Sequence, residues 1–93
     1  MLIKTGAECN SGDTNLGHQD TIQQCARKCA DAAGCDYFIF GTGSKTGNCY
    51  FENTGTGACT QGWEPDEYNF YALDKAGTHG TAQDPSTVVA ATK

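Results

Sequence analysis

The sequence has few of the large aliphatic and aromatic side chains that build a hydrophobic core. Its 93 residues include 3 Ile, 3 Leu, 2 Val and 4 Phe, about 13% of the chain, whereas 11 of its apolar residues are Ala and 6 are Cys. Below roughly 20% of such residues, burial alone does not offset the conformational entropy that folding costs. The length allows one domain. A chain of this composition is therefore either disordered or covalently cross-linked.

Two further shortages exclude classes of partner. The chain contains no run of even ten apolar residues, which excludes a transmembrane segment. Its 6 Lys and Arg are scattered among 11 Asp and Glu, giving a net charge of −5. Because nucleic-acid phosphates are bound by clustered cations, we expect no nucleic acid among the partners.

Six cysteines supply the cross-links that the weak core requires. An even number of cysteines in a short chain predicts a disulfide framework and an oxidising compartment, although six cysteines can pair in 15 ways. The alternative is a metal site at Cys25, Cys29 and Cys35, but paired CxxC knuckles are missing and both histidines, His18 and His79, lie far away in the sequence. We expect no metal and no other cofactor.

One helix and several short strands are indicated. Thr21 and Gln24 have capping-box spacing, and Gly34 stands where a C-terminal cap belongs. The apolar stripe between them consists of Ile22, Cys25, Cys29 and Ala32 or Ala33. Strand-like segments are residues 2–5, 37–40, 49–52 and 68–73, and the loops are 10–13, 41–48 and 53–62.

The last 20 residues differ in character from the rest. Residues 1–73 hold every cysteine and every aromatic residue, whereas Val88 and Val89 are the only branched aliphatic pair in residues 74–93. This division predicts a disulfide-stabilised domain over 1–73 and an extended C-terminal tail over 74–93. We expect the tail to supply part of the contact with a partner.

No arrangement of residues indicates catalysis. His18 has no nucleophile motif beside it, and the acidic cluster of Glu64, Asp66 and Glu67 surrounds Pro65 in a segment that we interpret as an exposed turn. We therefore expect no enzymatic activity.

The remaining candidates are surface residues around the single tryptophan. Trp63, Glu64, Asp66 and Tyr68 combine aromatic rings with carboxylates, a combination that binds sugar faces or anchors protein contacts. The competing interpretation is that Trp63 covers a thin core. These four residues are the binding residues that the sequence suggests.

Residues 21–50 carry a pattern in which a capped helix contains CxxxC, a third cysteine follows at Cys35, and an aromatic strand precedes Cys49. This pattern resembles the PAN/apple family, and the likeness covers about residues 3–73. The resemblance implies a small disulfide-rich α+β fold, with one helix packed on a short antiparallel sheet.

The resemblance also implies a disulfide pairing. Cys25 would pair with Cys49 and Cys29 with Cys35. The bridge that joins the terminal segments in apple-type members would be Cys9–Cys59. The sequence departs from the family here, because Cys59 precedes the last strand instead of following it.

Family members resemble adhesion modules rather than enzymes. We therefore expect a non-catalytic protein–protein interaction module, an accessory or structural subunit of a larger assembly. The protein would lie on the oxidising side of a membrane. It would either be secreted to the extracellular space or reside in an organelle lumen, such as that of a plastid. The alternative is a lectin-like PAN module for carbohydrate binding, with Trp63 and Tyr68 as stacking surfaces.

Overall fold

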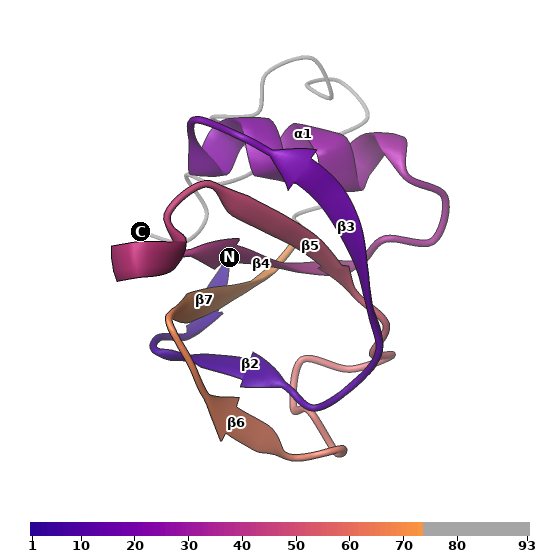
Figure 1. Cartoon of the computed structure of the whole chain (residues 1–93). Helices are drawn as coiled ribbons and strands as arrows, with labels where there is room; N and C mark the ends of the chain where they lie inside the picture. Colours follow the sequence, from indigo (N-terminus) through magenta and orange to yellow (C-terminus); the bar gives the residue numbers. More distant parts are fainter. Residues whose placement is uncertain (74–93) are drawn as a thin grey trace.

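The computed structural model describes residues 1–73, and the tail expected over 74–93 lies outside the described residues (Figure 1). The elements are β1 (Leu2–Lys4), β2 (Ala7–Cys9), β3 (Asp13–His18), α1 (Ile22–Asp31), β4 (Tyr37–Gly41), the 3₁₀ turn η1 (Gly43–Lys45), β5 (Asn48–Glu52), β6 (Trp63–Pro65) and β7 (Tyr68–Ala72). Within residues 1–73, the structure confirms a small, disulfide-rich arrangement of one α-helix with antiparallel sheets.

Five strands form the main sheet in the order β1-β7-β4-β5-β3, and every neighbouring pair is antiparallel. The aromatic strand β4 lies at the centre, where Ile39 is opposite Phe70 of β7 and Tyr50 of β5. A separate two-stranded sheet pairs β2 with β6, with Cys9 opposite Trp63. The β-prone aromatic residues therefore occupy the middle of the sheet, where both edges of each strand are hydrogen-bonded.

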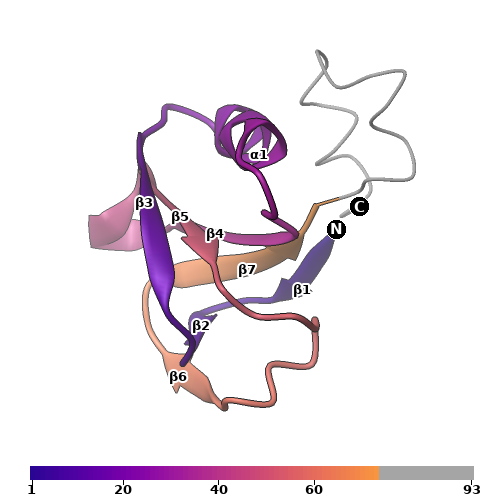
Figure 2. The ribbon, with the colours of Figure 1, turned by 90° about the vertical axis from the view of Figure 1, so that its right-hand side faces the viewer.

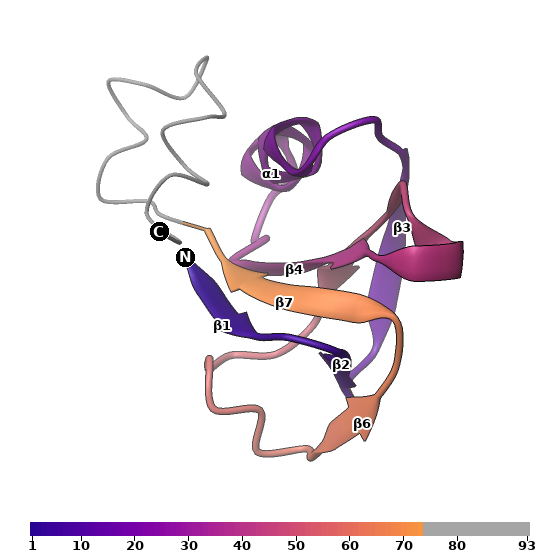
Figure 3. The ribbon, with the colours of Figure 1, turned by 90° about the vertical axis from the view of Figure 1, so that its left-hand side faces the viewer.

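The main sheet is covered on both faces (Figures 2 and 3). Helix α1 packs on one face, where Phe38 and Phe40 join the helical cysteines in one core cluster. On the other face, Ile39 and Phe70 form a second cluster with residues from β2, β6 and the 53–62 loop. Because side chains alternate along β4, successive residues pack into two thin cores on opposite faces of the sheet. Each core needs few aliphatic residues to be filled.

The helix begins as its capping pattern predicts. Thr21 is the N-cap, and its side chain accepts a hydrogen bond from the Gln24 backbone N–H at 3.1 Å. The expected C-cap is wrong, because the helix ends at Asp31 and extended Ala32 caps it. Gly34 does take a left-handed conformation (φ +81°), but it does so in the turn that leads to Cys35.

Three disulfides join the elements, and no cysteine is free. They are Cys9–Cys59, Cys25–Cys49 and Cys29–Cys35, the pairs that the resemblance implies. The second ties α1 to β5, and the third ties α1 to the segment before β4. The helix has only a narrow stripe of apolar residues to pack on the sheet. Its two disulfides, which start from that stripe, therefore supply much of its attachment to the rest of the fold.

Three strands were not expected from the sequence. β2 and β6 are only 3 residues each, and β3 is an edge strand whose residues are mostly exposed. The interpretation of the segment around Pro65 as an exposed turn is wrong at its start, because Trp63–Pro65 is paired with β2. Exposed or very short strands show no apolar alternation, so nothing in their patterning predicts them.

Candidate binding site

The residues suggested by the sequence lie in two separate neighbourhoods. The Trp63 ring is half-buried, packs edge-on against Phe70 at 4.9 Å between centroids, and lies 5.5 Å from Lys4 Nζ. Glu64 is exposed and lies opposite Glu8 on β2. The indole therefore covers the second core cluster, and one of its faces is already next to a lysine.

Asp66 and Tyr68 meet instead around Lys45. Lys45 Nζ donates to Asp66 Oδ1 at 2.6 Å and lies 5.2 Å from the centroid of the Tyr68 ring. Tyr68 is 6% exposed, and its hydroxyl accepts a hydrogen bond from Asn48 Nδ2 at 3.3 Å. The structure thus brings Asp66 and Tyr68 together but not with Trp63, and the Tyr68 ring offers little surface for stacking on a sugar.

Glu8 and Asp66 form a hydrogen-bonded pair of carboxyl groups. Burial, together with Asp66, raises the pKa of Glu8 to about 7. The hydrogen bonds from Glu8 and Lys45 hold the pKa of Asp66 well below its usual range. Two carboxyl groups this close share one proton near neutral pH. The hydrogen bond between them links β2 to the residue that follows β6.

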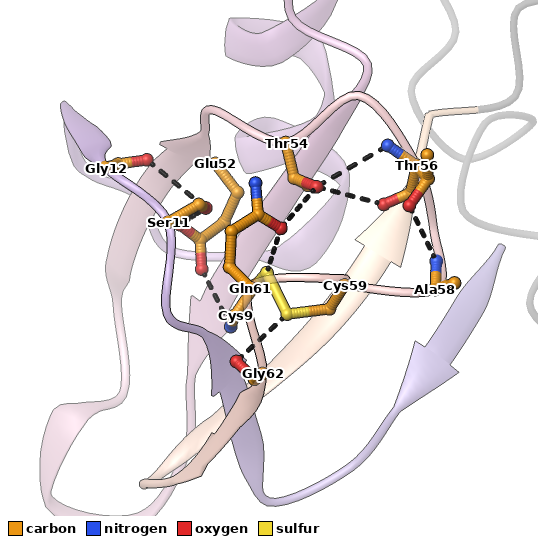
Figure 4. The surroundings of a disulfide bond; sticks show 10 residues. All are labelled: Cys9, Ser11, Gly12, Glu52, Thr54, Thr56, Ala58, Cys59, Gln61 and Gly62. Atoms are coloured by element: carbon orange, nitrogen blue, oxygen red, sulfur yellow. Dashed lines mark hydrogen bonds between the residues drawn. A yellow bond between two sulfur atoms is a disulfide. The ribbon is translucent and has the colours of Figure 1, made fainter.

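A second shifted carboxyl group lies beside the Cys9–Cys59 disulfide (Figure 4). Glu52 is 1% exposed and accepts hydrogen bonds from the Cys9 backbone N–H at 3.1 Å and from Ser11 Oγ at 3.3 Å. Burial raises its pKa to about 7, and nearby Asp13 adds to this effect, although the two hydrogen bonds oppose it. Both oxygens of Glu52 are used to hold neighbouring chain segments together, which is a structural role.

A polar pocket lies beside α1, away from all of these residues. Its volume is about 470 Å³, and its lining consists of His18, Gln19, Asp20, Gln24, Arg27 and Lys28. The lining comes from the end of β3, the β3–α1 connection and one face of the helix, and Figure 1 shows this connection running from the tip of β3 to the start of α1. The pocket is open to solvent, since four of its six lining residues are exposed: His18, Asp20, Gln24 and Lys28.

The β3 side of the pocket is held in place by backbone contacts. The Gln19 backbone N–H donates to the carbonyl oxygen of Gly47 at 2.9 Å, and Gln19 Nε2 donates to the Leu16 carbonyl oxygen at 3.2 Å. The His18 imidazole lies directly over Gly47, since a Cβ built there would come within 2.0 Å of Nε2. Only glycine at position 47 leaves room for this ring.

The helical side is fixed by the cap. Gln24 Oε1 accepts a hydrogen bond from the Asp20 backbone N–H at 2.9 Å, while Thr21 caps the Gln24 N–H. The connection and the first helical turn therefore restrain each other. A connection restrained in this way loses less backbone freedom when a ligand binds, which favours affinity.

The pocket also collects positive charge in an acidic domain. Residues 1–73 contain 4 Lys and Arg against 9 Asp and Glu, and two of those four cations, Arg27 and Lys28, line the pocket. Of the other two, Lys45 is ion-paired with Asp66 and Lys4 lies over Trp63. The pocket is the place in this part of the chain where two cationic side chains face one cavity.

Sequence reasoning missed this site. His18 has no catalytic motif beside it in the sequence, and no local pattern groups it with the other lining residues. The available signal was Arg27-Lys28, the only adjacent cations in the sequence, one helical turn beyond Gln24. Their relation to His18 depends on how the connection folds back to α1, which no local pattern predicts.

Other kinds of site are not indicated within residues 1–73. No group of His, Cys, Asp and Glu side chains in this range converges as metal ligands do. No helix in the same range has the length and apolar character needed to cross a membrane. Three disulfides without a free thiol are consistent with an oxidising environment.

Comparisons with protein-family models, with curated proteins and with solved structures find no match to this chain.

Proposed function

We propose that this chain is a non-catalytic binding module of PAN/apple-like fold, which acts on the extracellular or lumenal side of a membrane and holds a carbohydrate in the pocket beside α1. The observation that carries the proposal is the polar pocket lined by His18, Gln19, Asp20, Gln24, Arg27 and Lys28. Amide, carboxylate and cationic groups are the partners that sugar hydroxyl groups and sugar acids use.

The composition of the exposed surface supports a hydrophilic partner. Met1 is the one large apolar side chain exposed within residues 1–73, at 53%. Stable protein interfaces have an apolar, aromatic-rich centre, and this part of the chain presents none. The expected protein partner, with a contribution from residues 74–93, stays a prediction because that segment lies outside the described residues.

The absence of catalysis is part of the proposal. The carboxyl groups with raised pKa values, Glu8 and Glu52, lie away from the pocket and are already used by Asp66, Cys9 and Ser11. A catalytic acid needs room for a reacting group within hydrogen-bond distance. Their raised pKa values are explained by burial and pairing inside the fold.

A glycan array tests the proposal with the full chain and two single variants. We expect wild-type protein to bind a subset of glycans, and Lys28→Ala to lose that signal. Trp63→Ala, whose indole lies on the other side of the sheet, should retain it as long as the variant is folded. Absence of binding to every glycan would reject carbohydrate recognition, whereas loss with Trp63→Ala alone would move the site to the aromatic surface.

A further inference from the structure

The charge inside the pocket specifies its ligand more closely than its polarity does. Two of the lining side chains, Arg27 and Lys28, are cationic, and one, Asp20, is anionic. The rest of residues 1–73 is strongly acidic. A cavity with this balance attracts one negative charge, while the surrounding surface repels ligands that carry many.

Lys28 is the side chain best placed to make this contact. It is exposed, it lies in the last turn of α1, and it forms no ion pair with any residue of 1–73. Lys45, by comparison, has its charge satisfied by Asp66 at 2.6 Å. An ammonium group that faces a cavity without a carboxylate partner is available to an anionic ligand.

The remaining lining groups suit hydroxyl groups. Gln24 uses its carbonyl oxygen for the Asp20 N–H, and no hydrogen bond within residues 1–73 uses its amide nitrogen. The Asp20 carboxylate also lines the cavity. An amide donor and a carboxylate acceptor beside a cation match a sugar ring whose hydroxyl groups adjoin an acid group.

We propose that the pocket binds an acidic sugar, a saccharide with one carboxylate per ring, through an ion pair between that carboxylate and Lys28. The inference rests on the proposed function and narrows its ligand class. The hydroxyl groups of the same ring are held by Gln24 and Asp20, which fixes the orientation of the sugar.

The experiment compares an acidic sugar with its methyl ester, in which the negative charge of the carboxylate is removed. The full chain is titrated calorimetrically, at low and at physiological salt, with the methyl glycoside of galacturonic acid, which carries a single carboxylate, and with the methyl ester of the same glycoside. We expect the acid to bind at least tenfold more tightly than the ester, and its affinity to fall as salt rises. Lys28→Gln should lower the affinity for the acid about tenfold and leave the affinity for the ester unchanged.

Lys4→Gln is the matched control, since it removes an exposed lysine on the other side of the sheet. Equal affinity for acid and ester, or equal loss in Lys28→Gln and Lys4→Gln, overturns the inference while carbohydrate binding stands. If neither the acid nor the ester binds, the acidic-sugar inference is also overturned. The glycan array then decides whether the proposed carbohydrate binding stands. A chain that binds no glycan on the array refutes both proposals.

Discussion

The buried carboxyl group of Glu52 makes the stability of this domain depend on pH. Its pKa in the folded state is raised to about 7 from an ordinary value of 4.5, mainly by burial. The folded state therefore binds the Glu52 proton more tightly than the unfolded state does. The stabilising contribution is fully present below about pH 4.5, and it is lost as the pH rises from there to about 7.

The size of the effect follows from the difference between the two pKa values. Each unit corresponds to about 1.4 kcal/mol, so the change from 4.5 to about 7 corresponds to about 3 kcal/mol. A domain of this size has a total stability on the order of 5 kcal/mol. Glu8 adds a dependence of the same sign, and Asp66 opposes it at lower pH.

The variant Glu52→Gln isolates the contribution of Glu52. The glutamine oxygen can still accept from the Cys9 N–H, and its amide nitrogen can donate to Ser11 Oγ, so the local hydrogen bonds are retained without a titrating group. We expect the variant to be less sensitive to pH between 4.5 and 8. At pH 8 it should be more stable than wild type by about 1–3 kcal/mol.

Urea unfolding under non-reducing conditions measures this difference. Trp63 is the only tryptophan and packs against Phe70, so its fluorescence reports on unfolding. Glu64→Gln removes an exposed glutamate and controls for the Glu-to-Gln substitution itself, so it should not reproduce the gain in stability of Glu52→Gln at pH 8. If wild type and Glu52→Gln lose stability in parallel from pH 4.5 to 8, then burial of Glu52 does not control the pH dependence and the reasoning fails.

Three further predictions concern stability and share the same unfolding assay. Replacing Cys25 and Cys49 by serine together should cost about 3 kcal/mol, because their separation of 24 residues leaves a long loop open in the unfolded chain; a loss below about 1 kcal/mol would contradict this. Gly47→Ala should destabilise the domain clearly more than Gly6→Ala. Both glycines have positive φ, but only position 47 lies under the His18 imidazole. Equal losses of stability would mean that the imidazole moves aside freely. Thr21→Ala should cost about 1 kcal/mol through the lost N-cap, with Thr21→Ser close to wild type, and equal losses for both would exclude the cap as the cause.

Much of the main sheet and its helix could be predicted from the sequence. The aromatic segment that became β4 and the returning segment that became β5 are rich in β-prone residues, and Thr21 with Gln24 marks the helix start. The disulfide pairs were obtainable only from the resemblance, because spacing leaves 15 pairings open. These features depend on local residue types or on a recurring cysteine pattern.

The pocket and the covering strands could not be predicted in the same way. β2 and β6 are held by pairing between residues more than 50 positions apart, as Cys9 and Trp63 are. The placement of His18 depends on the absence of a side chain at Gly47, in a different loop. Both depend on contacts between distant segments, and single-sequence periodicity contains no information about such contacts.

The pocket lining comes from one continuous stretch of chain, residues 18–28, and this has a consequence for how the module can diversify. None of the lining residues belongs to the two core clusters, while Cys25 within the same stretch keeps the helix attached to β5. Substitution of the exposed Lys28 therefore leaves the sheet and its disulfides untouched, whereas substitution of His18 or Gln24 also changes the contact with Gly47 or the start of the helix. The ligand preference of the pocket can therefore be altered at single positions within eleven residues, without a new core and without a new disulfide.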